Sequence, residues 1–381
     1  MKYCLFFFVA FAMLASQLLA QDSLPAATQA KVDQLFSHVS PAGPGYVIGV
    51  IQNGEWVLQQ AYGRGNLEYD LALHSESVFN VASLSKQFTA AAIALLILDG
   101  KLSLEDKIGD HLPDLPPHTR SIRVKHLVYM TSGLPEYYQL PRANGSDWSS
   151  LHYFSIDTTI AAVMNQGQLN FKPGTRWSYS NIDYQVLTAI VEAVSGQRFA
   201  TFVRERLFAP LGMQHSLVND DLFEVIPNRV LGYNPRTPDN IDWLYESGYL
   251  KHRDTTGYVQ IQRHSPHYGG SGVYTSLADL KKWFDNFETR TFGGDAFYEL
   301  MHHRMKFKHD KQNDAFGLVF GDFNGEEIVW YEGGDWGFSA YFMRFPAKKL
   351  TVICLSNLGE GRAQRQAHRL MDILNDDGII R

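Results

Sequence analysis

The chain has 381 residues, with 34 basic and 40 acidic side chains and a formal net charge of −6 at pH 7. Hydrophobic residues make up 45% and charged residues 19%, the proportions of a globular chain with one large domain or two interleaved ones. The contents of glycine, 31, and proline, 15, exclude a collagen-like or disordered chain. The slight acidic excess provides no basic surface for nucleic acid, so the expected partner is a small-molecule or peptide substrate.

Residues 1–20 are predicted to be a secretory signal peptide. Lys2 supplies a short positive start, Leu5 to Ala15 is an apolar run too short to cross a bilayer comfortably, and Ala20 precedes the expected cleavage point. The alternative is an uncleaved N-terminal anchor. We therefore expect a periplasmic or secreted protein of residues 21–381, with no stable membrane span after cleavage; the sequence leaves its oligomeric state open.

The predicted elements start with strands at 46–52 and 55–62, separated by Asn53-Gly54, a strong hairpin signal. An Ala- and Leu-rich helix is predicted at 84–98, with Gly100 in place to end it. Further helices are predicted at 160–163, 184–195 and 199–207, and the polar, aromatic stretch 219–266 is predicted to form loops. The last part of the chain predicts strands at 316–320, 327–330, 337–345 and 350–355, followed by a helix at 364–374.

Strands at both chain ends with helices between them predict an α+β fold. We expect an antiparallel sheet built from both chain ends, flanked by helices, with an all-helical insertion. The sheet subdomain is expected at about 21–82 and 290–381, and the helical subdomain at about 83–289. Cys354 is the one cysteine of residues 21–381, and its apolar strand predicts a small buried hydrophobic side chain.

Ser83 and Lys86 are the first candidate catalytic residues, since a spacing of three at a helix start puts both on one face. A serine hydroxyl needs a base to become a nucleophile, and a buried lysine can provide one. Backbone N–H groups at a helix start favour a developing oxyanion. The alternative is a capping serine, Ser83 or Ser85, with a solvated lysine. However, the helix dipole disfavours a lysine in the first turn, which favours the catalytic interpretation.

Tyr179 and Asn181 form the second candidate group, in Tyr179-Ser180-Asn181 after a turn at 172–174. A tyrosine near positive groups can exchange a proton with a serine or a leaving group. The asparagine offers both a donor and an acceptor to a substrate carbonyl and to the lysine. A surface turn with an ordinary core tyrosine is the alternative.

The third candidate is the glycine-rich segment 331–338, with Tyr331, Gly333 and Gly334 as substrate-binding residues. Glycines at a strand edge let a substrate approach the backbone closely. The N–H of Gly334 is expected to complete an oxyanion hole with that of Ser83. A glycine-rich turn or bulge is the alternative. The histidines at 264, 267, 302 and 303 lack a recognisable metal-ligand spacing, so we predict neither a metal nor a cofactor.

These motifs together resemble those of the serine β-lactamase and D,D-peptidase superfamily, specifically its class C β-lactamase-like branch of carboxypeptidases, esterases and D-aminopeptidases. The motifs lie, in order, at 79–89, 126–135, 171–181 and 269–280. The resemblance implies an active site between sheet and helical parts. It also implies an acyl-enzyme on Ser83, with Lys86 and Tyr179 handling the proton and Asn181 positioning the substrate.

Tyr331 departs from this pattern, because the family usually has His or Lys there to hold a substrate carboxylate. Tyrosine keeps a hydrogen-bond donor but loses the charge, and Glu332 adds a negative one. We therefore predict weaker affinity for carboxylate-bearing β-lactams and a preference for neutral esters or amides. A β-lactamase or D-alanyl-D-alanine carboxypeptidase is the alternative enzyme, and a non-catalytic binding or sensor domain on the same fold is the alternative outside enzymes.

Overall fold

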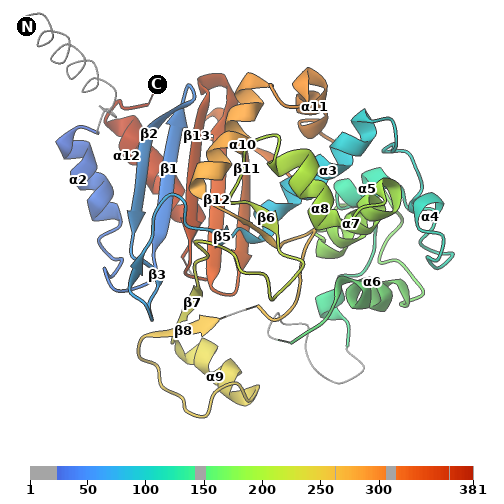
Figure 1. Ribbon diagram of the computed structural model, residues 1–381, viewed down its shortest axis with the longest axis horizontal. Helices are drawn as coiled ribbons and strands as arrows, with labels where there is room; N and C mark the ends of the chain where they lie inside the picture. The colour runs from blue at the N-terminus through green and yellow to red at the C-terminus, as the bar shows by residue number, and fades with distance from the viewer. Residues whose placement is uncertain (1–23, 142–151, 262, 306–314, 360, 381) are drawn as a thin grey trace, which may run out of the picture.

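The computed structural model describes residues 24–141, 152–261, 263–305, 315–359 and 361–380, so the predicted signal peptide lies outside them. A six-stranded antiparallel sheet forms one side of the molecule and helices cover both its faces (Figure 1). Its strand order is β10-β11-β12-β13-β1-β2. The bounds are β1 (Tyr46–Gln52), β2 (Glu55–Tyr62), β10 (Val319–Phe323), β11 (Glu326–Asp335), β12 (Phe338–Phe345) and β13 (Leu350–Ser356).

The sheet joins the two ends of the chain, as predicted. β1 pairs antiparallel with β13, from Tyr46 opposite Ser356 to Gln52 opposite Leu350. The predicted hairpin between β1 and β2 is confirmed, and its turn has φ of 54° at Asn53 and 82° at Gly54. Asparagine and glycine tolerate this left-handed backbone better than other residues, which is why the pair makes a tight hairpin.

Alternate residues of β1 face two different hydrophobic cores. Val47 and Ile51 belong to the larger core, together with Leu280 of α10 (Leu277–Thr289) and the central helix α3 (Lys86–Leu98). Ile48 belongs to the smaller core, together with α2 (Ala26–Leu35) and α12 (Ala363–Asp376) on the other face. Because both faces of the central strands are covered, β13 is buried along its length, and Cys354 is a buried side chain as predicted.

The helical part surrounds α3, whose residues Lys86 to Leu96 are all buried. A helix that is apolar all round is buried on every side, and α3 contacts α7, α8 and α11. The surrounding helices are α4 (Ile108–His111), α5 (Val124–Val128), α6 (Ile156–Met164), α7 (Asn181–Ser195), α8 (Phe199–Val203) and α11 (Gly294–Met301). The subdomain boundaries drawn from the sequence stay a prediction.

Some sequence-based expectations were wrong in detail. The stretch 219–266 contains β7 (Gly232–Pro235), α9 (Pro238–Glu246) and β8 (Tyr258–Ile261) rather than loops alone. The start of α9 follows ordinary capping rules, because the Thr237 side chain accepts from the backbone N–H of Asn240 and proline takes a first-turn position. The strand expected at 316–320 lies three residues later, as β10.

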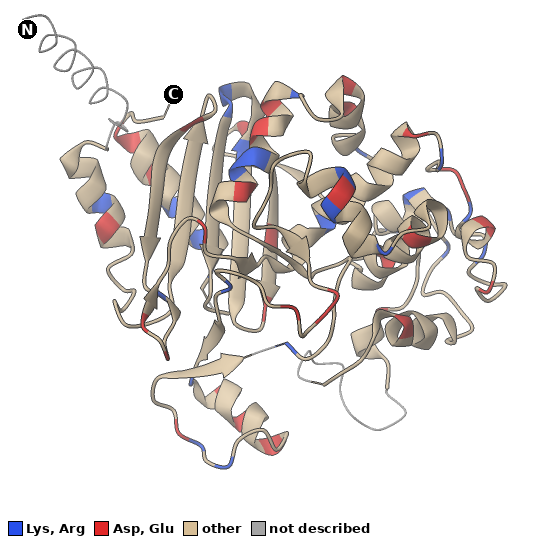
Figure 2. Ribbon diagram, in the orientation of Figure 1, with Lys and Arg blue, Asp and Glu red and all other residues tan. Residues whose placement is uncertain are grey.

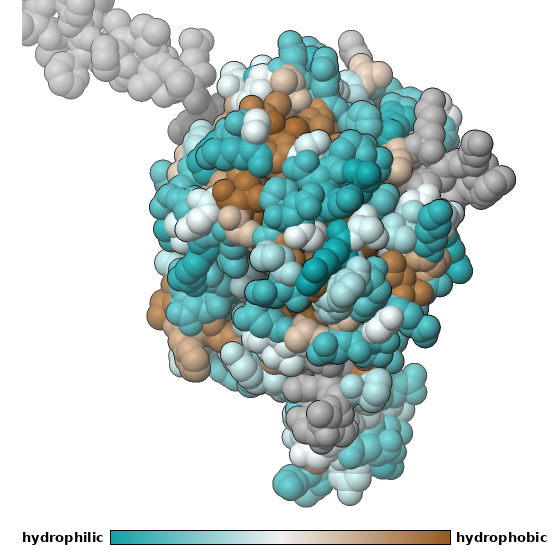
Figure 3. Space-filling view, turned by 90° about the vertical axis from the view of Figure 1, so that its right-hand side faces the viewer, coloured by the Kyte–Doolittle hydropathy of each residue, from teal (hydrophilic) through white to brown (hydrophobic). Residues whose placement is uncertain are grey.

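Short strands complete the described fold: β3 (Arg64–Asn66), β4 (Leu71–Ala72), β5 (Phe79–Asn80), β6 (Leu217–Val218) and β9 (Val273–Thr275). Basic and acidic residues are interspersed along the ribbon (Figure 2), and hydrophilic residues cover most of the face on the helical side (Figure 3). Within the described residues no single helix is long and apolar enough to cross a membrane, although α7 and the helical segment Phe199–Phe208 pass that test together as a pair bent by 78° at the break between them.

Candidate active site

Lys86 lies at the centre of a hydrogen-bonded cluster, with its side chain fully buried. Its Nζ is 2.7 Å from the Tyr179 hydroxyl, 2.8 Å from Asn181 Oδ1 and 2.7 Å from the Gly270 carbonyl oxygen. Ser83 Oγ is further away, at 3.3 Å. Three oxygen atoms therefore lie within 2.8 Å of Nζ, and Ser83 Oγ lies beyond them. The structure therefore brings together four predicted site residues and adds a backbone acceptor.

Ser83 and Tyr179 share the shortest contact of the cluster, with 2.6 Å between Oγ and the phenol oxygen. Ser83 is partly exposed and Tyr179 is 38% exposed, whereas Lys86 lies beneath them. A proton leaving Ser83 therefore has a shorter route to Lys86 through the tyrosine, in steps of 2.6 and 2.7 Å, than by the direct 3.3 Å contact.

The turn that carries Ser83 differs from the predicted helix start. Ala82–Ser85 forms a 3-10 turn, η1, and the regular helix α3 begins only at Lys86. Ala82 has φ of 47°, a conformation that L-residues rarely adopt. The backbone N–H of Ala82 donates to Asn80 Oδ1 at 3.0 Å, which helps hold this turn. No side-chain cap is formed by Ser85, whose Oγ instead accepts from the N–H of Val273 at 2.9 Å.

Tyr179 is held by backbone bonds between its own segment and the loop after α5. The N–H of Gly174 donates to the Thr131 carbonyl at 2.8 Å, and that of Ser178 donates to the Met130 carbonyl at 3.0 Å. Ser180 then caps α7, because its Oγ accepts from the N–H of Asp183 at 3.1 Å. The motifs at 126–135 and 171–181 are thus two halves of one support for Tyr179 and Asn181.

Sequence reasoning missed two buried carboxyl groups behind this support. Glu136 Oε2 accepts from the backbone N–H of Asn181 at 2.6 Å, and Asp183 Oδ1 accepts from Ser132 Oγ at 2.5 Å. Burial is the main cause that raises the pKa of Glu136, and it raises the pKa of Asp183 well above the usual range. The bond from Asn181 and the nearby Lys86 charge oppose the shift at Glu136. Neither residue stood out by spacing or periodicity.

The role of Gly270 also lay beyond the sequence argument, which used 269–272 only as part of the resemblance. Gly269 has φ of 89°, and a Cβ there would lie 2.6 Å from the carbonyl oxygen of Tyr184 in α7. The absence of a side chain therefore lets this loop reach α7 and place the Gly270 carbonyl beside Lys86.

The glycine pair of the third motif lies inside β11 and not in a turn. A Cβ on Gly333 would be 2.3 Å from the Val81 carbonyl oxygen and 3.1 Å from the Ser83 nitrogen. Glycine is therefore what allows β11 to pack against the turn that carries Ser83. Gly334, by contrast, has nothing within 4 Å of where its Cβ would be. Tyr331 is a largely buried residue of the same strand, at 7% exposure.

A cleft of about 720 Å³ opens beside Ser83. Its lining includes four predicted site residues besides Ser83, namely Tyr179, Tyr331, Gly333 and Gly334. Lys86 and Asn181 are not among the lining residues, so they lie behind Ser83 and Tyr179 as seen from the cleft. The remaining lining residues are Trp177, Val319, Trp330, Glu332, Ser339, Ala340, Gly359, Arg362, Ala363, Gln364 and Arg365.

Two arginines in this cleft were not anticipated. Arg362 and Arg365 are exposed residues at the start of α12. They are far from Ser83 in the sequence but belong to the lining of the same cleft. Glu332 is the acidic residue of the lining. The family motif points only to position 331 as the source of a cation, and the helix start at 362–365 could be assigned to the cleft only once the fold was known.

Two of the four histidines considered from the sequence, His267 and His302, have structural surroundings. His267 is a buried residue whose ring lies 4.6 Å from that of Phe154, and burial lowers its pKa well below the usual range. His302 stacks on Tyr298 at 4.1 Å, and burial lowers its pKa to about 3. In the part of the chain that the structure describes, no group of three or more His, Cys, Asp or Glu residues could hold a metal ion.

Known proteins are similar to this chain over most of its length. The family model described as Beta-lactamase matches residues 30–375. Penicillin-binding protein 4* of Bacillus subtilis (strain 168) is 30% identical over 334 residues, covering 83% of this chain and 68% of that protein. A D-aminopeptidase of Gluconobacter oxydans (strain 621H) is 23% identical over 337 residues, covering 88% of this chain and only 59% of that protein.

Among solved structures, the octameric penicillin-binding protein homologue from Pyrococcus abyssi superposes with a TM-score of 0.73 at 25% identity. That match covers 92% of this chain and 77% of the Pyrococcus chain. The likeness extends over nearly all of the sheet and the helical part, so the predicted β-lactamase/transpeptidase-like fold is confirmed.

Proposed function

This chain belongs to the β-lactamase family of serine hydrolases, and we propose that it cleaves an ester or amide bond through an acyl-enzyme on Ser83. One observation carries the proposal. Ser83 Oγ lies 2.6 Å from the Tyr179 hydroxyl, which lies 2.7 Å from the buried Lys86 Nζ, at the edge of a cleft of about 720 Å³. A nucleophile, a proton acceptor and space for a substrate are therefore adjacent.

In the acylation step, Ser83 Oγ forms a bond to the substrate carbonyl carbon and its proton passes to the Tyr179–Lys86 pair. The carbonyl electrons move onto oxygen and then return as the bond to the leaving group breaks. The same proton is delivered to the departing alcohol or amine, so the pair ends the step as it began. Asn181 and Gly270 hold Lys86 in place throughout through their oxygen atoms.

In the deacylation step, water adds to the ester carbonyl and gives its proton to the same pair. The bond from the acyl carbon to Ser83 Oγ then breaks, the serine recovers its proton, and the carboxylic acid leaves. The N–H groups of Ser83 and Gly334 stabilise the oxyanion in both steps. Such donors act on charge that develops only in the transition state, which is why they accelerate the reaction.

A second candidate is a carboxypeptidase or β-lactamase, whose substrate presents a carboxylate. It is favoured by Arg362 and Arg365, which give the cleft two cations although Tyr331 carries none. An arginine can bind a carboxylate through two parallel hydrogen bonds. The names of the relatives, a penicillin-binding protein and a D-aminopeptidase, are compatible with either candidate.

Steady-state hydrolysis of a p-nitrophenyl ester tests the proposal. We expect turnover by wild type, none above background by Ser83→Ala, and retained turnover by the matched control Ser85→Ala, because Ser85 Oγ bonds to the Val273 backbone and lies outside the cleft lining. A D-alanyl p-nitroanilide and a chromogenic cephalosporin, assayed in parallel, separate the two candidates. Equal turnover by wild type and Ser83→Ala would refute the proposal.

We also propose that the protein is exported and acts in the periplasm or outside the cell. The support is the positive start at Lys2, the apolar run and the cleavage pattern before Gln21. Intact-mass measurement of protein recovered from the periplasm or medium is expected to give a chain that starts near Gln21. A full-length chain held in the membrane fraction would contradict this.

A further inference from the structure

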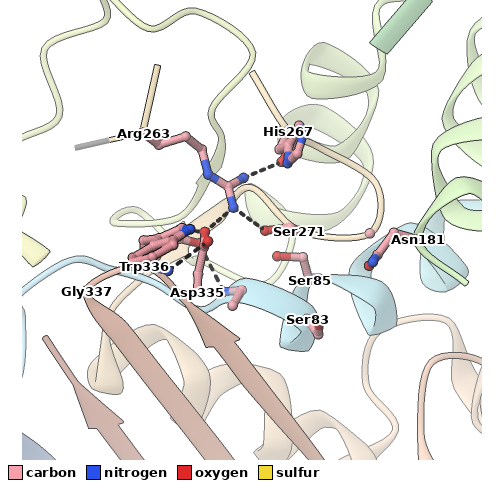
Figure 4. Close-up of polar contacts among 12 residues, drawn as sticks. Ser83, Ser85, Asn181, Arg263, His267, Ser271, Asp335, Trp336 and Gly337 are labelled. Carbon is pink, nitrogen blue, oxygen red and sulfur yellow. Dashed lines mark hydrogen bonds and ion pairs between the residues drawn. The ribbon is translucent and has the colours of Figure 1, made fainter. Parts of the chain in front are cut away.

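Arg263 and Asp335 form an ion pair that is nearly withdrawn from water, with side chains only 9% and 13% exposed. The Arg263 guanidinium also donates to the His267 carbonyl at 3.0 Å and to Ser271 Oγ at 3.1 Å. Figure 4 shows it between these two groups and Asp335. Ser271 directly follows Gly270, whose carbonyl binds Lys86. The arginine is therefore anchored in the loop that holds the general base.

The Asp335 carboxylate continues the network to the nucleophile. Its Oδ2 accepts from Asn80 Nδ2 at 2.9 Å, and its Oδ1 accepts from the backbone N–H of Trp336 at 2.9 Å. Asn80 in turn accepts from the N–H of Ala82 at 3.0 Å through Oδ1. Ala82 is the residue with the left-handed backbone, immediately before Ser83. Two hydrogen bonds thus connect Asp335 to the strained turn that presents the nucleophile.

Asp335 also directly follows Gly334 in β11. The two expected oxyanion donors, the N–H groups of Ser83 and Gly334, are therefore each next to a residue of the same network. Gly333 lets β11 contact the turn that carries Ser83. This contact alone does not fix the position of one segment along the other. The bond between Asn80 and Asp335 fixes that position, and Arg263 fixes Asp335.

We propose that Arg263 and Asp335 are positioning residues that set the separation of the two oxyanion donors and tie them to the Lys86 loop. This inference rests on the proposed hydrolase function. Neither side chain is expected to touch the substrate, since the cleft lining includes neither of them.

The ionic character of the pair supports a positioning role over simple stabilisation. Withdrawing two charges from water costs more than their attraction returns unless further hydrogen bonds satisfy them, so an apolar contact would stabilise the fold at least as well. A forked arginine fixes direction as well as distance, which an apolar contact does not. A shift of about 1 Å in such a support can reduce turnover about 100-fold.

The test compares Asp335→Asn, Arg263→Gln and the double variant in two assays, p-nitrophenyl ester hydrolysis and binding of a phenylboronic acid. Ser83 Oγ adds to the boron, and a boronate oxygen then takes the place of the oxyanion. We expect each single variant to lose about 100-fold in kcat and a similar factor in boronate affinity, with KM changed less than about twofold. Because the two residues act as one unit, the double variant is expected to lose no more than the worse single variant.

Glu288→Gln is the matched control, because it breaks the ion pair of the buried Arg344 with Glu288, 2.8 Å apart and outside the cleft lining. It is expected to lower the melting temperature and leave boronate affinity unchanged. Wild-type boronate affinity in a folded Arg263→Gln or Asp335→Asn variant would overturn the inference, and if Asp335→Asn does not fold, Arg263→Gln decides. A wild type that neither hydrolyses the ester nor binds the boronate would refute the proposed function, and this inference with it.

Discussion

The carboxylate of Glu136 accepts a hydrogen bond of 2.6 Å from the backbone N–H of Asn181, and the side-chain oxygen of Asn181 accepts one of 2.8 Å from Lys86. One asparagine therefore joins a buried acid to the buried lysine. Since Asn181 is also the first residue of α7, the acid lies at the positive end of a helix dipole, where negative charge is favoured.

Glu136→Gln is expected to gain stability relative to wild type as pH rises. Burial raises the pKa of Glu136 in the folded protein. The contribution of this residue to the free energy of unfolding is therefore present at low pH and is lost as pH rises through the raised pKa. Glutamine keeps an acceptor for the Asn181 N–H and has no proton to lose. The melting-temperature difference, variant minus wild type, is therefore expected to be larger at pH 8 than at pH 5.

The exposed Glu76→Gln is the control, and its melting-temperature difference is expected to stay constant over the same range. If Glu136→Gln gave the larger difference at pH 5 instead, the stated cause of the shift would be wrong.

Tyr179→Phe is expected to lower kcat about 10²- to 10⁴-fold, the range in which a positioned acid or base contributes. The change removes the hydroxyl that bridges Ser83 and Lys86 and leaves the ring in place. Since Tyr179 is 38% exposed, the melting temperature is expected to change little. Ester hydrolysis and thermal denaturation measure the two effects, and a kcat within about threefold of wild type would exclude the relay through tyrosine.

Gly333→Ala and Gly334→Ala are expected to differ in stability although they are neighbours. A Cβ at position 333 overlaps the Val81 carbonyl oxygen at 2.3 Å, so β11 has to move away from the nucleophile turn. Such overpacking costs about 1–3 kcal/mol. A Cβ at position 334 meets nothing within 4 Å. Urea denaturation of both variants measures the difference, and equal midpoints would show that β11 does not need glycine to approach Ser83.

The double variant Arg362→Gln/Arg365→Gln is expected to lower kcat/KM for a substrate with a free carboxylate by about 3- to 10-fold, the range for exposed charge pairs. The kcat/KM for a neutral ester is expected to stay unchanged. Added salt is expected to lower the wild-type kcat/KM for the carboxylate-bearing substrate toward that of the variant. An unchanged ratio between the two substrates would remove the support for the carboxypeptidase or β-lactamase candidate. Tyr331→His in the same assay tests the sequence-based expectation that a cation is lacking at that position.

The fold and the reactive cluster were largely predictable from local patterns. Asn53-Gly54 specifies its hairpin by backbone preference alone. The spacing of Ser83 and Lys86 predicted that the two side chains lie together, as they do, although Ser83 belongs to the 3-10 turn before α3. Tyr179 and Asn181 were identified through their motif, and the structure places both within hydrogen-bond distance of Lys86.

The supporting residues were not predictable in this way. Glu136 meets Asn181 across 45 positions, and Asn80 meets Asp335 across 255. Such contacts depend on how distant segments pack, which no local period or spacing encodes. The helix at 238–246 was missed for a different reason. Loops were predicted there from the polar and aromatic composition, although the Thr-Pro sequence is a clear signal for a helix start.

Intact-mass spectrometry after exposure to a fluorophosphonate would show whether Ser83 is the nucleophile. We expect one covalent adduct on wild type, located at Ser83 by peptide mapping, and no adduct on a folded Ser83→Ala protein. A folded wild type without an adduct, or an adduct that persists in Ser83→Ala, would contradict the claim that Ser83 is the nucleophile.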